Sequence, residues 1–464
     1  MSYSELNAGD LAFLEGLLTP ARLLAGEAVG EDYCHDEMNG VSARPGAVCF
    51  AQSVEEISAV MRHAYRRELP VVVRGSGSGL VGGAVALCGG IMIVTTGMNR
   101  ILELDLENLT LTVEPGVLLM DIVKYLDPLG LFYPPDPGEK SATIGGNIAT
   151  NAGGMRAVKY GVTRDYIRAL TCVLPDGEVI RLGGKTVKTS SGYDLKDLIC
   201  GSEGTLAVVA QAVLKLLPKP RHTVSLLVPY ADYETAIASV PRIVASRATP
   251  TAVEFMERRA ILMAQEYLKK GFPDTDYPAY LLMTFDGSTK AQVCADYEAA
   301  ASLCLDELGA EDVFVIDTEE RYDMVWSARG VLLEAIKAST GEMDECDVVV
   351  PRSSVAELLA FAAALSEKHG LRMPSFGHAG DGNMHIYLCR DELDRAEFER
   401  RKGLVFDELY EKARALGGQV SGEHGIGCAK RPYLMRSLGR EYALMRGIKR
   451  VFDEKNILNP GKVI

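Results

Sequence analysis

The chain has 464 residues, with 49 Lys and Arg against 63 Asp and Glu and a formal net charge of −14. This length corresponds to roughly two to four domains and provides a core that needs no disulfide or structural metal. The negative balance argues against a general nucleic-acid or anionic-membrane binder, because such proteins present a basic surface.

The cysteines and the apolar segments restrict the class further. None of the ten cysteines forms a CxxC pair, which argues against a zinc ribbon or a disulfide framework. No stretch of about 18 apolar residues occurs, and Met1–Asp10 is polar rather than signal-like. We therefore predict a cytoplasmic protein without a transmembrane segment and without a nucleic-acid partner.

The N-terminal part predicts a β-α-β unit that continues into a β-rich domain. Leucines at helical spacing predict a helical opening over 11–30, and Ser53 with Glu56 forms a capping-box pattern ahead of an apolar helical face. The expected elements that follow are a strand at 47–51, the helix after Ser53, strands at 70–73, 91–96, 101–105 and 109–114, and a helix near 117–129.

A second domain is predicted beyond Pro218-Lys219-Pro220, since two prolines interrupt any helix or central strand. Strands and helices alternate there, which favours an α+β domain whose sheet is covered by helices on one side. The expected strands are 223–229, 279–285, 312–317 and 346–350, and the expected helices are 232–246, 290–308, 319–339, 354–369 and 391–416.

A glycine-rich loop follows the strand at 70–73. Gly77-x-Gly79-x-x-Gly82 matches the Rossmann dinucleotide motif, but that motif requires a helix opening at its third glycine. The segment 82–90 is too rich in glycine to supply one. An ordinary glycine turn is the simplest alternative, whereas the small or cationic run Arg74–Gly79 would offer backbone N–H groups to an anion.

Further glycine clusters occur at 141–147, 151–154 and 201–205. Paired glycines let the backbone approach a flat or charged ligand, and the Ser, Thr and Asn residues among them supply short polar contacts. Structural turns alone would not need so many clusters, so the sequence favours a large ligand held by several loops.

Histidines concentrate near the C-terminus, where three of the seven lie between 378 and 424. His378 and His385 flank a glycine-rich turn between two strand-like segments, which can bring both imidazoles toward one point. Glu423 and His424 follow on another glycine-flexible segment. Two His and one carboxylate suit a divalent ion with open positions, although the spacing alone also fits ordinary core or surface histidines.

The chain contains, in this order, the segments RGSGSG, PPDPGEKSATIGGNIATNAGG, YGVTRD and GSEGTL. These segments resemble the flavin domain of the vanillyl-alcohol oxidase fold, in its branch of FAD-linked D-lactate and glycolate dehydrogenases. The resemblance implies an α+β protein with a two-part FAD-binding domain of the vanillyl-alcohol oxidase/PCMH type at 1–220. It also implies a substrate (cap) domain with a mainly antiparallel sheet at 221–416. The last implied segment, 417–464, returns to the FAD domain and completes the active site.

The resemblance also implies which residues contact FAD, with the pyrophosphate at the Gly75–Gly79 loop. Some relatives attach flavin covalently through a histidine in this loop. Residues 74–83 contain neither His nor Cys, so noncovalent FAD is predicted. The implied contacts are Arg74, Gly75, Ser76, Gly77, Ser78, Gly79, Asp136, Ser141, Gly145, Gly146, Asn147, Asn151, Gly153, Gly154, Gly201, Glu203, Gly204 and Asn459.

Carried over by position, the resemblance implies one divalent metal (iron, zinc or manganese) held by His378, His385 and Glu423. His424 would be the general base, since a neutral imidazole suits removal of a hydroxyl proton near pH 7. Arg329 would bind the substrate carboxylate with its guanidinium fork; a surface helix charge is the alternative. Asn383 and Lys430 are weaker substrate candidates.

Two positions at which this chain differs from relatives narrow the range of expected substrates. Hydroxyglutarate dehydrogenases of the family carry a threonine and a lysine where this chain has Leu333 and Glu345. An apolar residue and an anion disfavour a second carboxylate. The resemblance therefore implies oxidation of D-lactate, a small D-2-hydroxy acid, to pyruvate by hydride transfer to flavin N5.

The electron acceptor is predicted to be external, because neither a nicotinamide site nor an iron–sulfur cysteine cluster is present in the sequence. Similarity to lactate dehydrogenases of anaerobes implies an electron-transferring flavoprotein (Etf) as partner, with flavin-based electron bifurcation or confurcation. Three other hypotheses stay open: the glycolate-oxidising subunit of a multi-subunit enzyme, a metal-dependent hydrolase without flavin, and an electron-transfer module with a vestigial site.

Overall fold

The computed structural model describes residues 3–464, which pack as two compact units. The first unit consists of the chain up to Ala152, Val162–Pro218 and Glu423–Ile464, and the second of Gly153–Gly161 and Lys219–Gly422. Residues 153–161 and 417–422 thus group with the second unit, whereas the predicted domain bounds group them with the FAD-binding domain.

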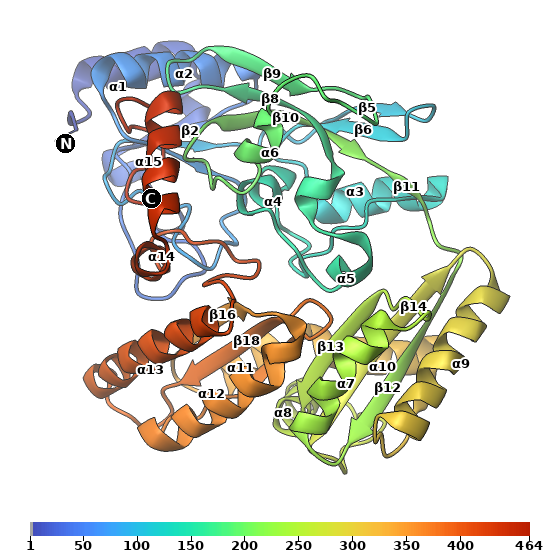
Figure 1. The fold of residues 1–464 in the computed structure, drawn as a ribbon. Helices are drawn as coiled ribbons and strands as arrows, with labels where there is room; N and C mark the ends of the chain where they lie inside the picture. The colour runs from blue at the N-terminus through green and yellow to red at the C-terminus, as the bar shows by residue number, and fades with distance from the viewer. Residues whose placement is uncertain (1–2) are drawn as a thin grey trace. The chain divides into compact units, whose positions relative to one another are not determined.

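One sheet of the first unit contains three parallel strands, of which β2 is labelled in Figure 1. The sheet has the order β1-β2-β4-β3, with β1 antiparallel at its edge. Every residue of β4 is buried, as expected for a central parallel strand. The elements are β1 (Leu23–Ala25), β2 (Ala47–Phe50), α2 (Val54–Arg67), β3 (Val71–Arg74) and β4 (Ile91–Val94).

The structure confirms the predicted start of helix α2 and its predicted apolar face. Ser53 Oγ accepts a hydrogen bond from Glu56 N at 3.2 Å. The Glu56 carboxylate, however, accepts from Gln52 N at 2.8 Å, so only one half of the predicted capping box forms. The buried residues that pack against the sheet are Ile57, Val60, Met61 and Ala64.

The helical opening is shorter than the predicted 11–30. Helix α1 spans Ala8–Leu17 and is followed by Pro20. The residue before a proline favours extended backbone, and Thr19 has a ψ of 153°. The rest of the segment forms short 3₁₀ turns and strand β1.

The other large sheet of the first unit is antiparallel, with the order β5-β6-β10-β8-β9. Along β10 every second residue is buried, which is the pattern of a sheet with one covered face. The elements are β5 (Ile101–Asp105), β6 (Thr110–Val113), β8 (Ile167–Val173), β9 (Val179–Gly183) and β10 (Val208–Lys215), with α3 (Leu119–Leu126) and α4 (Ile144–Thr150) between strands.

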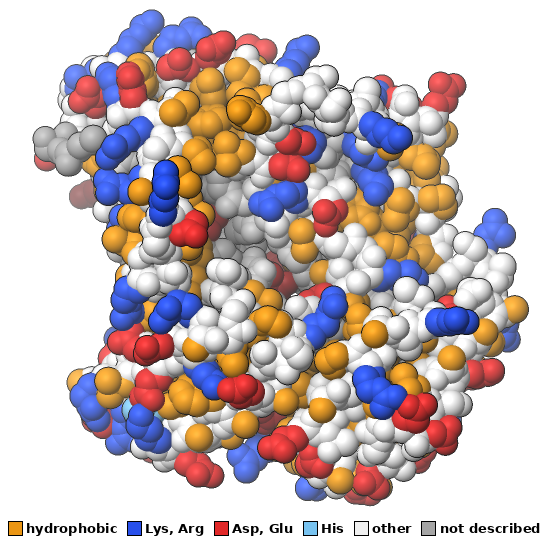
Figure 2. Space-filling view, in the orientation of Figure 1, with side chains coloured by type: hydrophobic (Ala, Val, Ile, Leu, Met, Phe, Trp, Pro, Cys, Tyr) orange, Lys and Arg blue, Asp and Glu red, His pale blue; other side chains and the backbone are white. Residues whose placement is uncertain are grey.

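The glycine-rich stretch 75–90 contains no helix, and the next element is β4. This confirms that Gly77-x-Gly79-x-x-Gly82 is not a Rossmann site. Among residues 3–464, no helix is both long enough and apolar enough to cross a membrane. On the face drawn in Figure 2, Lys and Arg side chains are interspersed with Asp and Glu rather than gathered into one basic patch.

The second unit is built on a seven-stranded sheet with the order β15-β12-β14-β13-β17-β18-β16. All its strand pairs are antiparallel, which confirms the predicted α+β domain. The strands are β12 (His222–Tyr230), β13 (Ala252–Glu257), β14 (Ala279–Gly287), β15 (Phe314–Ile316), β16 (Met343–Val349), β17 (Ser375–His378) and β18 (Asn383–Cys389).

Helices cover both faces of this sheet. Tyr233 of α7 lies against Phe255 on one face, with ring centroids 6.1 Å apart, whereas α8, α10 and α11 pack with Met256 on the other. Because successive strand residues point to opposite faces, the prediction of helices on one side is wrong. The helices are α7 (Tyr233–Ala245), α8 (Arg258–Leu268), α9 (Lys290–Glu307), α10 (Glu319–Gly330), α11 (Leu332–Ala338), α12 (Val355–His369) and α13 (Arg395–Ala415).

The single helix predicted over 319–339 is broken into α10 and α11. The break falls at Val331, which has a φ of −107° and a ψ of 11°. Gly330 precedes it, and glycine has a low helix propensity. Helix α10 therefore ends directly after Arg329, which is buried at its last turn.

Candidate active site

The loop after β3 requires glycine at two positions. A Cβ on Gly75 would collide with the Thr143 hydroxyl, and a Cβ on Gly77 would collide with the Arg74 guanidinium. Gly77 also has a φ of +81°, a conformation that glycine adopts at little cost. Within residues 3–464, the backbone N–H groups of residues 75–79 donate to no protein acceptor. The loop thus has the form of an anion-binding nest.

Arg74 lies behind this loop rather than in the pocket that the loop lines. Its Nη1 donates to the His35 carbonyl at 2.7 Å, and its guanidinium carbon lies 6.0 Å from the Tyr33 ring centroid. Burial lowers the pKa of Arg74, and the Asp36 carboxylate opposes that shift. Arg74 therefore supports the loop from inside the unit.

A pocket in the first unit is lined by the glycine loop, by α4 and by residues 202–204, together with Glu423 and His424. Its lining is the right kind for a cofactor with a pyrophosphate and a flat ring, because glycine backbone faces it from three separate segments. The predicted FAD contacts that line it are Gly75, Ser76, Gly77, Ser78, Gly79, Gly145, Gly146, Asn147, Glu203 and Gly204.

Several other predicted FAD contacts lie outside that lining: Arg74, Asp136, Ser141, Asn151, Gly201 and Asn459. The exposed Ser141 donates from its backbone N to Glu139 Oε1 at 2.7 Å. Asn151 ends α4 in the left-handed region, and its Oδ1 accepts from Arg164 N at 2.9 Å. The Asn459 amide nitrogen donates to the carbonyl of Glu203 at 2.8 Å.

Gly153 and Gly154 belong to the second unit in this structure. The short segment that contains them is tied to β14, since the Tyr160 hydroxyl donates to Asp286 Oδ1 at 2.9 Å and Lys159 Nζ donates to the Asp286 carbonyl at 2.9 Å. A flavin contact from these two glycines stays a prediction.

Glu203 holds the chain just beyond His424. The backbone N–H groups of Ile426 and Gly427 each donate to its carboxylate at 2.7 Å. Burial raises the pKa of Glu203, and these two hydrogen bonds act in the opposite direction. Glu203 itself has a φ of +51°, a left-handed backbone conformation that is uncommon for residues other than glycine. The sequence predicts a flavin contact for Glu203 but not this second role.

His424 is partly exposed and lines the pocket, and its Nε2 lies 3.8 Å from Glu423 Oε1. Lys430, the weaker substrate candidate, is buried in the first unit. Its positive charge lowers the pKa of Glu203, which places the lysine near that carboxylate.

In the second unit, four neighbouring strands carry polar side chains on one sheet face. The register of β13 with β17 pairs Phe255 with Gly377, which brings Glu254 beside His378. The register of β17 with β18 pairs Phe376 with His385. His378 and His385 are near neighbours, with ring centroids 5.4 Å apart and an interplanar angle of 88°. This confirms that the glycine-rich turn brings the two imidazoles together.

Glu254 contacts both His378 and Arg329. His378 Nδ1 lies 2.7 Å from Glu254 Oε1, and Arg329 Nε donates to Glu254 Oε2 at 2.8 Å. Burial alone would raise the pKa of Glu254, but its interactions with His378 and Arg329 outweigh burial and leave the pKa lowered. Arg329 is thus a buried residue rather than a surface helix charge, and its guanidinium lies 4.8 Å from the Phe376 ring.

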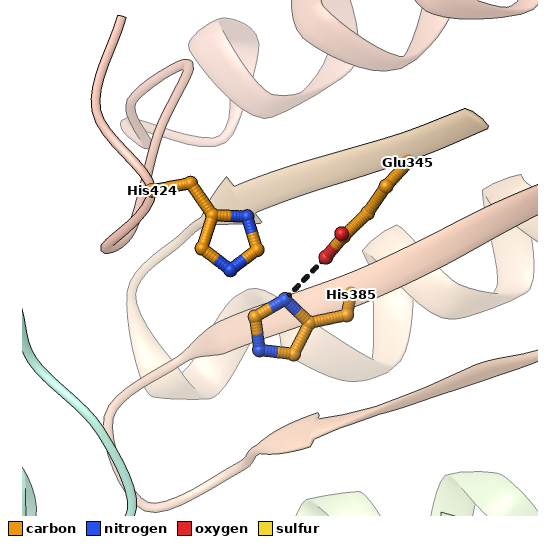
Figure 3. A group of neighbouring side chains, drawn as sticks. All are labelled: Glu345, His385 and His424. Carbon is orange, nitrogen blue, oxygen red and sulfur yellow. Dashed lines mark ion pairs between the residues drawn. The ribbon is translucent and has the colours of Figure 1, made fainter. Parts of the chain in front are cut away.

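The second histidine has a carboxylate partner of its own. His385 Nδ1 lies 2.9 Å from Glu345 Oε1, as the dashed line in Figure 3 marks. Each imidazole thus has a carboxylate oxygen beside its Nδ1, but only the His378–Glu254 pair has the geometry of a hydrogen bond. For His378 this arrangement favours a neutral ring that carries its proton on Nδ1 and binds a metal through Nε2. His378 and His385 accordingly fit a divalent ion.

Asp347 organises the chain just ahead of Glu423. Its carboxylate accepts from the Ser421 hydroxyl at 2.7 Å and from Gly422 N at 3.2 Å. It also accepts from the Asn383 amide nitrogen at 2.7 Å. The amide nitrogen of Asn383, a predicted substrate contact, is therefore used to hold this segment.

Three carboxylates of this site, Glu254, Glu345 and Asp347, have roles that sequence reasoning missed. Each lies within a mostly apolar strand and has a side chain that is at least largely buried. An acidic residue inside an apolar strand is the only available signal, because a buried charge needs a partner. The partner itself depends on strand register and cannot be read from the sequence.

Two family models match the chain, one mainly in each of its two units. The FAD binding domain family matches residues 45–183, and the family of FAD linked oxidases, C-terminal domain, matches residues 219–463. The chain is 47% identical to a D-lactate dehydrogenase of Anaerostipes hadrus, over 96% of this chain and 95% of that protein. It is 40% identical to the glycolate oxidase subunit GlcD of Bacillus subtilis, over 93% and 91%.

Solved structures of more distant proteins share the fold. p-Cresol methylhydroxylase with substrate bound superposes with a TM-score of 0.81 at 18% identity, over 99% of this chain and 98% of that one. The 4-ethylphenol oxidase from Gulosibacter chungangensis gives a TM-score of 0.78 at 18% identity, over 100% and 98%. These confirm the predicted PCMH-type fold. The chain belongs to the family of FAD-linked oxidases and is an FAD-dependent oxidoreductase of the D-lactate dehydrogenase and glycolate oxidase type.

Proposed function

We propose that the protein oxidises D-lactate to pyruvate in a reaction that depends on FAD and on one divalent metal. The relatives named D-lactate dehydrogenase, at 47% and 40% identity, support this substrate. Two electrons and one proton leave Cα as a hydride, and the hydroxyl proton leaves separately. The observation that carries the proposal is the pair of neighbouring imidazoles on one sheet face, each with a carboxylate beside it, together with the buried Arg329 guanidinium that pairs with Glu254.

The role we propose for each residue follows from its charge. Arg329 binds the substrate carboxylate: among residues 3–464, Glu254 engages its Nε and Nη2, and Nη1 makes no hydrogen bond. His424 accepts the hydroxyl proton, since neutral imidazole is a suitable base near pH 7. Bound FAD supplies the hydride acceptor, flavin N5, and a bound divalent ion would lower the pKa of the substrate hydroxyl.

The metal ligands we propose are His378, His385 and Glu423. The carboxylate partners of both histidines support this set, and Glu423 directly follows Gly422, which Asp347 holds in the second unit. Iron, zinc and manganese all suit two imidazoles and one carboxylate. Stripping the metal with a chelator should abolish turnover while the FAD stays bound, and re-adding one of these ions should restore turnover.

The substrate is a small monocarboxylate. Leu333 packs against the apolar cluster of the second unit, and the Glu345 carboxylate lies beside His385. Neither residue can pair with a distal carboxylate, so D-2-hydroxyglutarate should be a poor substrate. Glycolate is the second candidate, because the relative from Bacillus subtilis is named as a glycolate oxidase subunit.

The two electrons pass to an external acceptor, and we propose an electron-transferring flavoprotein in this role. The proposal extends the resemblance to lactate dehydrogenases of anaerobes, and flavin-based electron bifurcation would be its consequence. Reduction of purified Etf by D-lactate in the presence of catalytic amounts of this protein tests it. A rate of D-lactate oxidation that is the same with and without Etf would contradict the proposal.

Steady-state turnover with an artificial electron-accepting dye tests the substrate assignment. We expect kcat/KM to be highest for D-lactate, lower for glycolate, and at least tenfold lower still for L-lactate and D-2-hydroxyglutarate. His424→Gln should lower kcat by about 100- to 10,000-fold, the usual contribution of a general base. A preference for glycolate over D-lactate would instead favour the glycolate-oxidising subunit.

A further inference from the structure

Glu254 is a carboxylate with no exposure to solvent in the middle of a strand. Its side chain is 0% exposed, and Val253 and Phe255 on either side are also buried. Such a position normally holds an apolar residue, because an ionised carboxylate loses its hydration there. Its carboxylate is compensated there by an ion pair with Arg329 and by a contact with the His378 imidazole.

The two oxygens of Glu254 serve two different groups. Oε1 lies 2.7 Å from His378 Nδ1, and Oε2 accepts from Arg329 Nε at 2.8 Å and also from Nη2. Replacing a buried ion pair with apolar residues often leaves a fold equally stable, so fold stability alone does not explain this arrangement. The contacts instead fix the orientation of one imidazole and one guanidinium relative to each other.

We propose that Glu254 is a positioning residue that couples the metal ligand His378 to the substrate-binding Arg329. The inference rests on the proposed function, in which these two groups bind the metal and the substrate carboxylate. Through Oε1, Glu254 sets the ring orientation and the Nδ1-protonated form of His378. Through Oε2, it holds one edge of the guanidinium and thereby presents Nη1 to the substrate.

Glu345 provides a contrast, because its Oε1 lies 2.9 Å from Nδ1 of the other histidine, His385 (Figure 3), whereas among residues 3–464 the ion pair of Arg329 is with Glu254 and not with Glu345. Loss of either carboxylate should weaken metal binding. Only loss of Glu254 should also disturb the guanidinium that binds substrate. The two residues therefore separate a role in metal binding from a role in coupling the metal to the substrate site.

The test compares three variants of the full-length, FAD-loaded chain: Glu254→Gln, Glu345→Gln and Glu257→Gln. Glu257 is the matched control, since it is a partly buried carboxylate on the same strand and its partner is the Ser375 hydroxyl. The affinity of metal-stripped protein for Zn²⁺, Mn²⁺ and Fe²⁺ is first measured for the wild type, and the tightest-binding ion is used for the variants. Loss of a carboxylate behind a metal-ligating histidine should weaken binding by about 10- to 100-fold for Glu254→Gln and Glu345→Gln. Glu257→Gln should stay within twofold of the wild type.

The coupling is read from KM for D-lactate at saturating metal. For Glu345→Gln, saturation with metal should return KM to within about threefold of the wild type. For Glu254→Gln, KM should stay at least tenfold raised, because Arg329 has lost its partner. Wild-type metal affinity in Glu254→Gln would overturn the proposal, and a KM restored by metal would overturn the link to Arg329.

Glu254→Gln leaves Arg329 buried without its anion, so a variant that folds poorly is a foreseeable result. The double variant Glu254→Gln with Arg329→Met removes both charges and keeps the test valid through metal affinity, which should again fall by at least tenfold. Bound FAD per chain reports folding in each case. A wild type that binds no metal would overturn both the proposed function and this inference. A wild type that binds metal alongside an unaffected double variant would overturn the inference alone.

Discussion

At the scale of single residues, the pocket of the first unit depends on glycines that leave no room for a methyl group. Gly77 combines a φ of +81° with direct contact to the Arg74 guanidinium. A side chain there must displace a buried arginine or change the loop backbone that lines the pocket. The identity of this residue therefore follows from both backbone conformation and packing.

Gly77→Ala should weaken FAD binding at least tenfold, because the loop can no longer keep its conformation. Gly184→Ala is the control, since its Cβ would meet nothing within 4 Å. The readout is the FAD-to-protein ratio after gel filtration at low protein concentration. Equal flavin retention in the two variants would contradict a binding role for this loop.

The side chain of Glu257 should make the stability of the fold depend on pH. Burial raises its pKa from 4.5 to about 7, although the Ser375 hydroxyl acts in the opposite direction. The folded state thus holds a proton that the unfolded state has released, so stability falls as pH rises from about 4.5 to about 7. The cost above pH 7 is about 3 kcal/mol, from 1.36 kcal/mol per pKa unit.

Glu257→Gln removes the titrating group and keeps the side-chain shape. The melting temperature of this variant relative to the wild type should therefore be higher at pH 8 than at pH 5. Thermal unfolding followed by circular dichroism at both pH values measures this. A difference that is the same at both pH values would show that Glu257 does not titrate in this range.

At the scale of elements, strand register assembles the polar row of the second unit. The turn between β17 and β18 places His378 and His385 near each other, and its glycine-rich sequence predicts this. β13 contributes Glu254 from far away in the sequence, and β16 contributes Glu345. These neighbours follow from sheet order, which the local pattern of residues does not contain.

The segment after His424 is a second element-scale feature, held by Glu203. Glutamine at 203 can accept from one of the two backbone N–H groups of Ile426 and Gly427, but its amide would face the other. An unsatisfied buried group costs about 1–3 kcal/mol, which would loosen this segment. Glu203→Gln should therefore lower kcat about tenfold through His424.

The measurement is single-turnover reduction of bound FAD by D-lactate, with FAD content determined in the same sample. Lys430→Met, which removes a nearby charge and leaves both backbone hydrogen bonds in place, serves as the comparison. If Glu203→Gln loses FAD but reduces the remaining flavin at the wild-type rate, then Glu203 acts on cofactor binding and not on the His424 segment.

At the scale of the whole molecule, motifs predicted more than periodicity did. The FAD-binding fold, the antiparallel sheet of the second unit and the closeness of His378 to His385 are confirmed. Local patterns failed where long-range packing decides the structure. Strand β13 and helix α8 were not predicted, because charged residues interrupt their apolar patterns. Helix α8 and its neighbours also cover a sheet face that was expected to carry no helices. The carboxylates behind the histidines could not be predicted, because they depend on which strands are neighbours.

The proposed reaction is tested most directly by anaerobic titration of the FAD-loaded, metal-replete protein with D-lactate. One equivalent of D-lactate should bleach the flavin absorbance of one FAD and form one pyruvate, whereas L-lactate should leave the spectrum unchanged. A flavin that D-lactate does not reduce, even after re-addition of iron, zinc or manganese, would contradict the account.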